Sequence, residues 1–313
     1  MAASRVWLVT LLIAAAWLHH SVGALTVGYY DRTCSSAESI VRGAVRSAVS
    51  SDRTIAASLL RLHFHDCFVQ GCDASILLTG SGTEQTAFPN QSIRGYNVIA
   101  AAKSQLEASC PGVVSCADIV ALAARDSVAI LGGAFYDAET GRSDGTSPGA
   151  VNLPQPNMSI DQAAVFFTNL GLTLEDMVIL LGSHTVGVSQ CQFFVDRLYN
   201  FGGTGKPDPT LNTAYLAQLQ SLCPNVQGGT NNVALDLNSE FSFDTSYYRN
   251  IQANKGLLQI DQEIGDDART SGTVNTLAAS SNAFGNKFGT AIVAMGRIGA
   301  LTSGKVRAVC DSA

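Results

Sequence analysis

The chain has 313 residues, of which 46% are hydrophobic and 14% are charged, and its formal net charge is −6. A chain of this length and composition can bury a large core. It contains no run of basic residues, so we do not expect nucleic acid as a partner. After residue 23, no stretch approaches the roughly 20 apolar residues that a membrane-spanning helix needs, so we expect no membrane span.

Residues 1–23 have the pattern of a secretory signal peptide. Arg5 precedes an apolar stretch from Val6 to Leu18, and small residues follow it. The stretch is too short, and its flanks are wrong, for a membrane anchor. We expect cleavage after Gly23 or Ala24 and a secreted product.

All eight cysteines lie after this leader. An even number of cysteines in a secreted chain indicates four disulfides, although spacing alone leaves their pairing open. The chain contains no Cys-x-x-Cys pair, so we do not expect a zinc site.

Apolar and alanine-rich residues recur with helical periodicity over most of the chain, and alternating strand-like runs are scarce. Ser115 with Asp118, and Thr173 with Asp176, have the spacing of helix N-terminal caps. We therefore expect an all-α fold of about ten helices, in two lobes with a site between them. The segments with this periodicity include Ser36–Val49, Tyr96–Ala108, Cys116–Leu131, Ile160–Leu170, Leu174–Leu181, Gln190–Tyr199, Thr213–Leu222, Ser246–Ala253 and Ala278–Met295.

Only three histidines follow the leader, and two of them, His63 and His65, lie in one run. Thr54 can cap the helix that is predicted to carry this run. Arg61 and His65 are four residues apart, so they share one helix face, whereas His63 points elsewhere. Because a fixed cation beside His65 has no use in packing, we interpret His65 as a chemical group and His63 as a buried core residue.

The third histidine, His184, follows Gly182 and Ser183 near the end of another predicted helix. It has no arginine beside it, so the two histidines suit different tasks. One would bind a metal, while His65 would act as acid and base and Arg61 would stabilise developing negative charge. Cleavage of peroxide at a haem iron needs this set of groups.

Several motifs share the pattern of one family. They are Arg61-Leu62-His63-Phe64-His65-Asp66-Cys67-Phe68-Val69-x-Gly71-Cys72-Asp73-Ala74-Ser75, Val114-Ser115-Cys116-Ala117-Asp118, Asn152-Leu153-Pro154, Ser183-His184-Thr185-x-Gly187, Asp196-Arg197-Leu198-Tyr199-Asn200-Phe201 and Gly256-Leu257-Leu258-Gln259-x-Asp261-Gln262-Glu263. With them the chain resembles the secreted plant haem peroxidases (class III) from Tyr30 to Cys310.

The resemblance implies a single haem-peroxidase domain over residues 24–313. Its distal lobe (roughly 24–150) and proximal lobe (roughly 151–313) would enclose haem b. On the distal side, His65 would be the acid and base and Arg61 its cationic partner. The amide of Asn90 would accept a hydrogen bond from His65, with Glu84 behind it. Arg61 and a buried pocket are expected to lower the pKa of His65.

On the proximal side, the resemblance makes His184 the axial ligand of the iron and Asp261 the carboxylate that hydrogen-bonds its imidazole. Such a carboxylate strengthens the ligand. Pro154, Phe88 and Phe193 would bind aromatic donors at the haem edge.

The resemblance also implies two Ca²⁺ ions, which prefer oxygen ligands. The first would be bound by Asp66, Val69, Gly71, Asp73 and Ser75, and the second by Thr185, Asp236, Ser239, Ser242 and Asp244. The family's disulfides would pair Cys34–Cys110, Cys67–Cys72, Cys116–Cys310 and Cys191–Cys223.

We therefore expect a secreted, monomeric enzyme that reduces H₂O₂ and oxidises small phenolic donors in one-electron steps, through a ferryl porphyrin-radical intermediate. No C-terminal extension suggests the vacuole, so an extracellular or cell-wall location is expected. One alternative is a calcium-stapled extracellular or wall-associated haem-binding protein with little turnover, for which an altered Arg61 or His65 would be typical. Another is a non-haem metallohydrolase using His63, His65 and Asp66, which would need further histidine ligands.

The chain has two N-glycosylation sequons, at Asn90 and Asn157. Asn90 is expected inside the distal pocket, where a glycan could not be buried. Asn157 follows a proline-rich stretch and precedes a predicted helix, so we expect it to carry the glycan.

Overall fold

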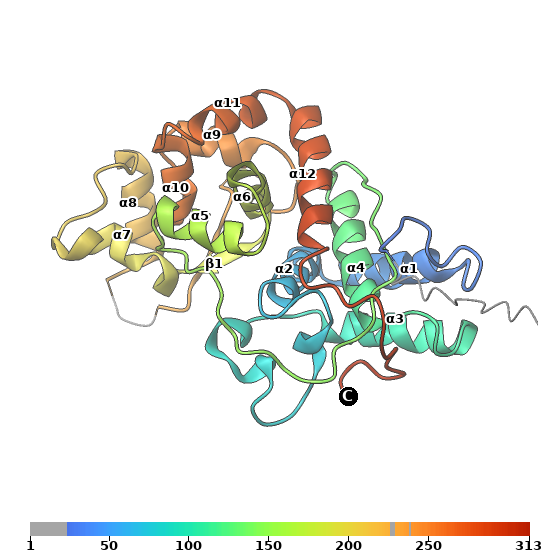
Figure 1. The fold of residues 1–313 in the computed structure, drawn as a ribbon. Coiled ribbons are helices and arrows are strands. Elements are labelled where there is room, and N and C mark those ends of the chain that lie inside the picture. Colours follow the sequence, from blue (N-terminus) through green and yellow to red (C-terminus); the bar gives the residue numbers. More distant parts are fainter. Residues whose placement is uncertain (1–23, 226–228, 238) are drawn as a thin grey trace, which may run out of the picture.

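The computed structural model describes residues 24–225, 229–237 and 239–313. The expected signal peptide lies outside this range. The described residues form twelve α-helices, six short 3₁₀ helices and one two-stranded sheet (Figure 1). The predicted all-α fold is confirmed. In the described part, no single helix is long and apolar enough to cross a membrane, although one bent pair, residues 160–169 with 174–185, passes on length and composition.

The first group of helices surrounds α4, which is buried along almost its whole length. α2 packs along α4, and α1 packs on both α3 and α4. Three 3₁₀ helices lie in the connection between α2 and α3. The bounds are α1 Ala37–Ser51, α2 Ile55–Cys67, η1 Ser75–Leu77, η2 Glu84–Thr86, η3 Phe88–Asn90, α3 Tyr96–Ser109 and α4 Cys116–Ile130.

Apart from α12, which stands beside α4 in Figure 1, the second group lies on the side of α2 away from α4. It includes the small antiparallel sheet, in which Ser189 pairs with Val233. α9 packs on α11, and α12 packs on α6 and α11. The bounds are α5 Ile160–Asn169, α6 Leu174–Leu181, η4 Gly182–Thr185, β1 Val188–Gln190, η5 Cys191–Phe193, α7 Val195–Tyr199, η6 Phe201–Gly203, α8 Thr213–Leu222, β2 Asn232–Ala234, α9 Ser246–Gln252, α10 Gln259–Asp266, α11 Ser271–Ala279 and α12 Ser281–Met295.

After α12 the chain returns to the first group of helices and packs against the loop that follows α2. Gly71 in that loop has a φ of 129°, and a Cβ there would lie only 2.7 Å from the carbonyl oxygen of Gly299. The guanidinium of Arg307 donates a hydrogen bond to the carbonyl of Ala74 (2.7 Å). The C-terminal segment therefore helps to fix the loop beside His65.

The structure contains four disulfides, and no described cysteine is free. The Cys67–Cys72 bond closes a short loop at the end of α2. The pairs are those that the family resemblance implies, namely Cys34–Cys110, Cys67–Cys72, Cys116–Cys310 and Cys191–Cys223.

Two of the predicted helix caps are present, and one is wrong. The hydroxyls of Ser115 and Thr173 accept hydrogen bonds from the main-chain N–H groups three residues later, at 3.1 and 3.0 Å. Thr54 makes no such bond, because its backbone is helical (φ −68°, ψ −19°) and not extended as at an N-cap. Its hydroxyl donates to Asp52 Oδ1 (2.6 Å).

Two predicted helix ranges are also wrong. Residues 190–199 are not one helix, because Gln190 ends β1 and an irregular Phe194 separates η5 from α7. The predicted helix over 278–295 is divided at Ser280, whose hydroxyl caps α12. α10 had no counterpart among the predicted helices.

Candidate functional site

Arg61 and His65 lie one turn apart on α2, as their spacing predicts. Arg61 Nε donates a hydrogen bond to His65 Nε2 across 3.0 Å. The other guanidinium nitrogens donate to Ser92 Oγ (2.9 Å) and to the carbonyl of Pro89 (3.0 Å), so the guanidinium is held on three sides. Because a guanidinium can only donate, His65 Nε2 must carry a lone pair rather than a proton.

The opposite ring nitrogen, His65 Nδ1, lies 2.6 Å from Asn90 Oδ1. Asn90 Nδ2 donates to the main-chain carbonyl of Glu84 (2.9 Å), which leaves Oδ1 as the acceptor. Nδ1 therefore carries the proton and donates it to Asn90. The two neighbours fix one neutral tautomer of His65.

Glu84 contacts Asn90 through its main chain rather than through its carboxylate. The buried carboxylate accepts a hydrogen bond from the N–H of Gly149 (2.7 Å), and burial raises its pKa. Glu84 thus positions the amide of Asn90 and does not touch His65.

Burial and the charge of Arg61 lower the pKa of His65 to about 3, against the opposing effect of the hydrogen bond to Asn90. Burial, with a smaller contribution from Arg142, lowers the pKa of His63 to about 3 as well. The pKa does not distinguish the two histidines, but their partners do. His63 is buried with its Nδ1 3.5 Å from the sulfur of Cys67, which agrees with its interpretation as a core residue.

His184 lies in η4, directly after α6, and its Nδ1 is 2.8 Å from Asp261 Oδ1. Asp261 Oδ1 also accepts a hydrogen bond from the hydroxyl of Tyr247 (2.9 Å), and Oδ2 accepts one from the N–H of Leu258 (3.0 Å). Since Tyr247 and Leu258 both donate to this carboxylate, its oxygens serve as acceptors, and His184 Nδ1 is assigned as the third donor. Nε2 is then the nitrogen that can bind a metal.

The exposures of His184 and Asp261 suit a metal ligand and the buried carboxylate that hydrogen-bonds it. The side chain of His184 is 28% exposed, whereas that of Asp261 is 0% exposed. The His184 ring is therefore partly open to solvent, whereas the carboxylate that hydrogen-bonds it is fully buried.

Sequence reasoning missed Tyr247, because nothing in residue spacing links the start of α9 to Asp261 on α10. Its neighbour Tyr248 is also buried, but the Tyr248 hydroxyl donates to the carbonyl of Val178 (3.1 Å) on α6. Of these two adjacent tyrosines, only Tyr247 acts on the carboxylate behind His184.

The residues expected at the first calcium site lie between the end of α2 and the start of η1, and all of them except the half-buried Val69 are buried. Asp66 Oδ2 accepts a hydrogen bond from the N–H of Ala74 (3.0 Å), and Asp73 Oδ1 accepts one from the N–H of Ser75 (2.9 Å). Asp66 Oδ1 and Ser75 Oγ are buried without a hydrogen-bond partner in the described structure. Burial and the nearby Asp73 raise the pKa of Asp66 well above its ordinary value. Such a site favours a cation.

In the described part of the chain, no three His, Cys, Asp or Glu side chains gather as a metal site. A cation in this loop would therefore also need hydroxyl and carbonyl oxygens, such as the expected carbonyls of Val69 and Gly71. The Gly71 carbonyl now accepts a hydrogen bond from the N–H of Asp73 (2.9 Å).

The residues expected at the second calcium site are joined by hydrogen bonds. The Thr185 hydroxyl donates to Asp236 Oδ2 (3.2 Å) and to the carbonyl of Ser242 (3.4 Å). Ser239 Oγ donates to Asp244 Oδ1 (3.3 Å). One further residue, Ser246, was missed, and its hydroxyl contacts both Asp236 and Asp244.

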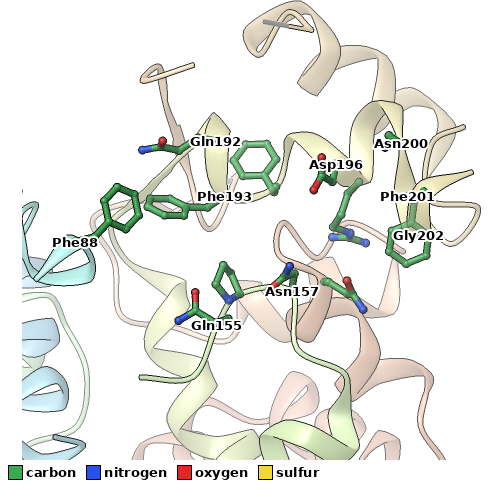
Figure 2. Close-up of a pocket in the computed structure, with 14 residues that line it drawn as sticks. Phe88, Gln155, Asn157, Gln192, Phe193, Asp196, Asn200, Phe201 and Gly202 are labelled. Atoms are coloured by element: carbon green, nitrogen blue, oxygen red, sulfur yellow. The ribbon is translucent and has the colours of Figure 1, made fainter. Parts of the chain in front are cut away.

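Phe88 and Phe193, two of the expected donor-binding residues, lie near one another with ring centres 6.3 Å apart. They line a pocket of about 460 Å³, and Phe88 is 63% exposed (Figure 2). Pro154 is not part of this lining, but the next two residues, Gln155 and Pro156, are.

The peroxidase family profile matches residues 41–280, a range that includes both histidine motifs. The chain belongs to the peroxidase family. It is 46% identical to Peroxidase 71 of Arabidopsis thaliana, over 93% of this chain and 90% of that protein. It is 45% identical to Peroxidase N1 of Nicotiana tabacum, over 91% of this chain and 89% of that protein. It is also 45% identical to Peroxidase 5 of Vitis vinifera, over 98% of this chain and 96% of that protein.

These relatives confirm the resemblance to the class III plant peroxidases. The chain is accordingly a peroxidase enzyme, which oxidises its substrates with H₂O₂.

In this peroxidase, the rate constant for reaction with H₂O₂ should stay nearly constant as the pH falls from about 7 to about 5. His65 keeps its basic Nε2 until the pH approaches its pKa of about 3, so the proton acceptor is lost only in stronger acid. Stopped-flow mixing with limiting peroxide measures this rate constant at each pH in the range. A fall in the rate constant with a midpoint near pH 6.5, about the ordinary pKa of histidine, would contradict the assignment of His65 as the buried base.

Proposed function

We propose that this peroxidase binds haem b between His65 and His184 and uses it to oxidise small phenolic donors with H₂O₂. The observation that carries the proposal is the opposite surroundings of the two histidines: His65 Nε2 faces a guanidinium, and His184 Nδ1 faces a carboxylate. Bound haem supplies the iron that holds the peroxide and accepts its oxidising equivalents.

His184 would hold the iron through Nε2, because its Nδ1 is engaged by Asp261 and its ring is partly exposed. Asp261 makes the His184 imidazole a stronger electron donor, which would favour higher oxidation states of a bound iron. Leu258 and Tyr247 hold the Asp261 carboxylate and so fix the orientation of the ring. Tyr247 shares Oδ1 with His184, and its donation moderates the pull of the carboxylate on the His184 proton.

On the distal side, His65 moves a proton between the two oxygens of the peroxide. Nε2 accepts the proton from one oxygen and returns it to the other as that oxygen leaves as water. Arg61 cannot lose its charge at neutral pH, so it stabilises the negative charge that develops on the leaving oxygen. Asn90 keeps the ring in the one tautomer that can do this.

The donor pocket suits neutral aromatic rings. Phe88 and Phe193 offer ring faces and edges for stacking with a phenol, as aromatic pairs prefer. We place Pro154 at the edge of this region, since Gln155 and Pro156 already line the pocket.

The proposal includes two Ca²⁺ ions. The first is supported by the unsatisfied buried oxygens of Asp66 and Ser75, and the second by the carboxylates that surround Ser246. Asp66 adjoins His65 and Thr185 adjoins His184 in the sequence, so each ion would brace one of the two histidines.

We further propose that residues 1–23 are a signal peptide and that residues 24–313 form one secreted, monomeric domain of two lobes in the extracellular space or cell wall. The pattern of the leader and four disulfides support secretion. The alternative of a haem-binding protein with little turnover is not favoured, because the relatives of this chain are peroxidases and because Arg61 and His65 are both in place.

Replacing His65 by alanine should slow the reaction with H₂O₂ by about 10²–10⁴-fold, because a positioned general base contributes that much. His63→Gln serves as the matched control, since His63 is equally buried on the same helix but has no guanidinium partner. Stopped-flow rates, normalised to haem content from the absorbance spectrum, give the comparison. A larger loss in His63→Gln would reverse the assignment of the two histidines.

Removing calcium should lower both the thermal midpoint of unfolding and the activity, because the buried carboxylates of Asp66 and Asp73 would lose their counter-charge. Metal analysis of the native protein and thermal unfolding with and without chelator test this, and added Ca²⁺ should restore both properties. Ser75→Ala should make calcium easier to remove with chelator, because the variant lacks one of the proposed oxygen ligands. Native protein without calcium, or chelation with no effect on stability, would contradict the proposal.

A further inference from the structure

The sequon at Asn157 lies in the wall of the donor pocket. Asn157 is exposed and shares the lining of this pocket with Phe88 and Phe193. Figure 2 shows Gln155 and Asn157 on one side of the pocket, with Gln192, Phe193 and Asp196 on the other. The side chain of Asn157 makes no hydrogen bond within the described part of the chain, so a modification there breaks no contact.

The backbone around Asn157 is held firmly. The N–H of Met158 donates to the carbonyl of Gln155 (3.2 Å), which closes a turn with Asn157 at its exposed side. Ser159 then caps α5 through a reciprocal pair of contacts with Gln162. The N–H of Ile160 donates to a carboxylate oxygen of Glu263 on α10 (2.7 Å). A group attached to Asn157 would therefore start from a fixed point at the pocket.

The other sequon provides an internal contrast. Asn90 is 2% exposed, and both polar atoms of its amide are engaged, by His65 and by the main chain of Glu84. A glycan is bulky and must remain at the surface. Of the two sequons, only the one at Asn157 can carry a glycan in the folded, hydrogen-bonded structure.

We propose that Asn157 carries an N-linked glycan and that this glycan screens the donor pocket by size. The proposal rests on the proposed role of Phe88 and Phe193 in donor binding. The pocket, at about 460 Å³, is large enough for a small phenol. A glycan that starts from its wall leaves room for such a molecule and obstructs the approach of a phenol attached to a large carrier.

The test compares the peroxidase from a eukaryotic secretory host before and after enzymatic removal of its N-glycans. Glycopeptide mass spectrometry gives the occupancy of Asn157 and Asn90. The readout is the ratio of kcat/KM for a dextran-linked phenol to kcat/KM for free guaiacol. We expect Asn157 occupied, Asn90 bare, and a several-fold rise in this ratio when the glycan is removed.

Two variants separate the glycan from the side chain. Asn157→Gln, made in the same host, should show the same raised ratio as the deglycosylated enzyme. Ser159→Thr keeps both the sequon and a capping hydroxyl, so its occupancy and ratio should match those of the unchanged enzyme. A bare Asn157, or a ratio that glycan removal leaves unchanged, would overturn the proposal. Loss of guaiacol oxidation in every form of the enzyme would instead contradict the proposed role of Phe88 and Phe193 in donor binding.

Discussion

The hydrogen bond from Arg61 Nε to His65 Nε2 is the contact on which the proposed chemistry depends. It places a permanent cation against a neutral ring nitrogen, an arrangement that persists only if the histidine stays unprotonated at that nitrogen. Burial ensures this by lowering the pKa of His65. One turn of α2 sets the spacing of the pair, while Ser92, Pro89 and Asn90 hold the two side chains from outside the helix.

The same side chain serves two proposed tasks because the fold gives it opposite surroundings. His65 lies between a guanidinium and an amide, so its free nitrogen is a base kept ready for a proton. His184 lies against a buried carboxylate that makes its free nitrogen a strong ligand. Tyr247 shares that carboxylate and adds a second donor to it. The two settings come from separate groups of helices, α2 with η3 for His65 and η4 with α9 and α10 for His184.

The sequence predicted the parts of this site that local geometry determines. The pairing of Arg61 with His65 follows from their spacing on a helix. The partner of His65, Asn90, came only from the family resemblance, because a long connection of 3₁₀ helices brings it to α2. Tyr247 and Ser246 gave no signal, since their contacts join distant segments. The cap at Thr54 is absent because the Thr54 backbone is already helical, which is not the extended conformation of a capping residue.

Opposing hydrogen bonds from Arg61 and to Asn90 hold His65 as a single neutral tautomer. Neutron crystallography of the resting enzyme near neutral pH would locate the protons on this ring. We expect deuterium on His65 Nδ1, facing Asn90, and none on Nε2, facing Arg61. We also expect deuterium on His184 Nδ1, facing Asp261. Deuterium on His65 Nε2 would rule out the proposed role of His65, because that nitrogen could not then accept a proton from peroxide.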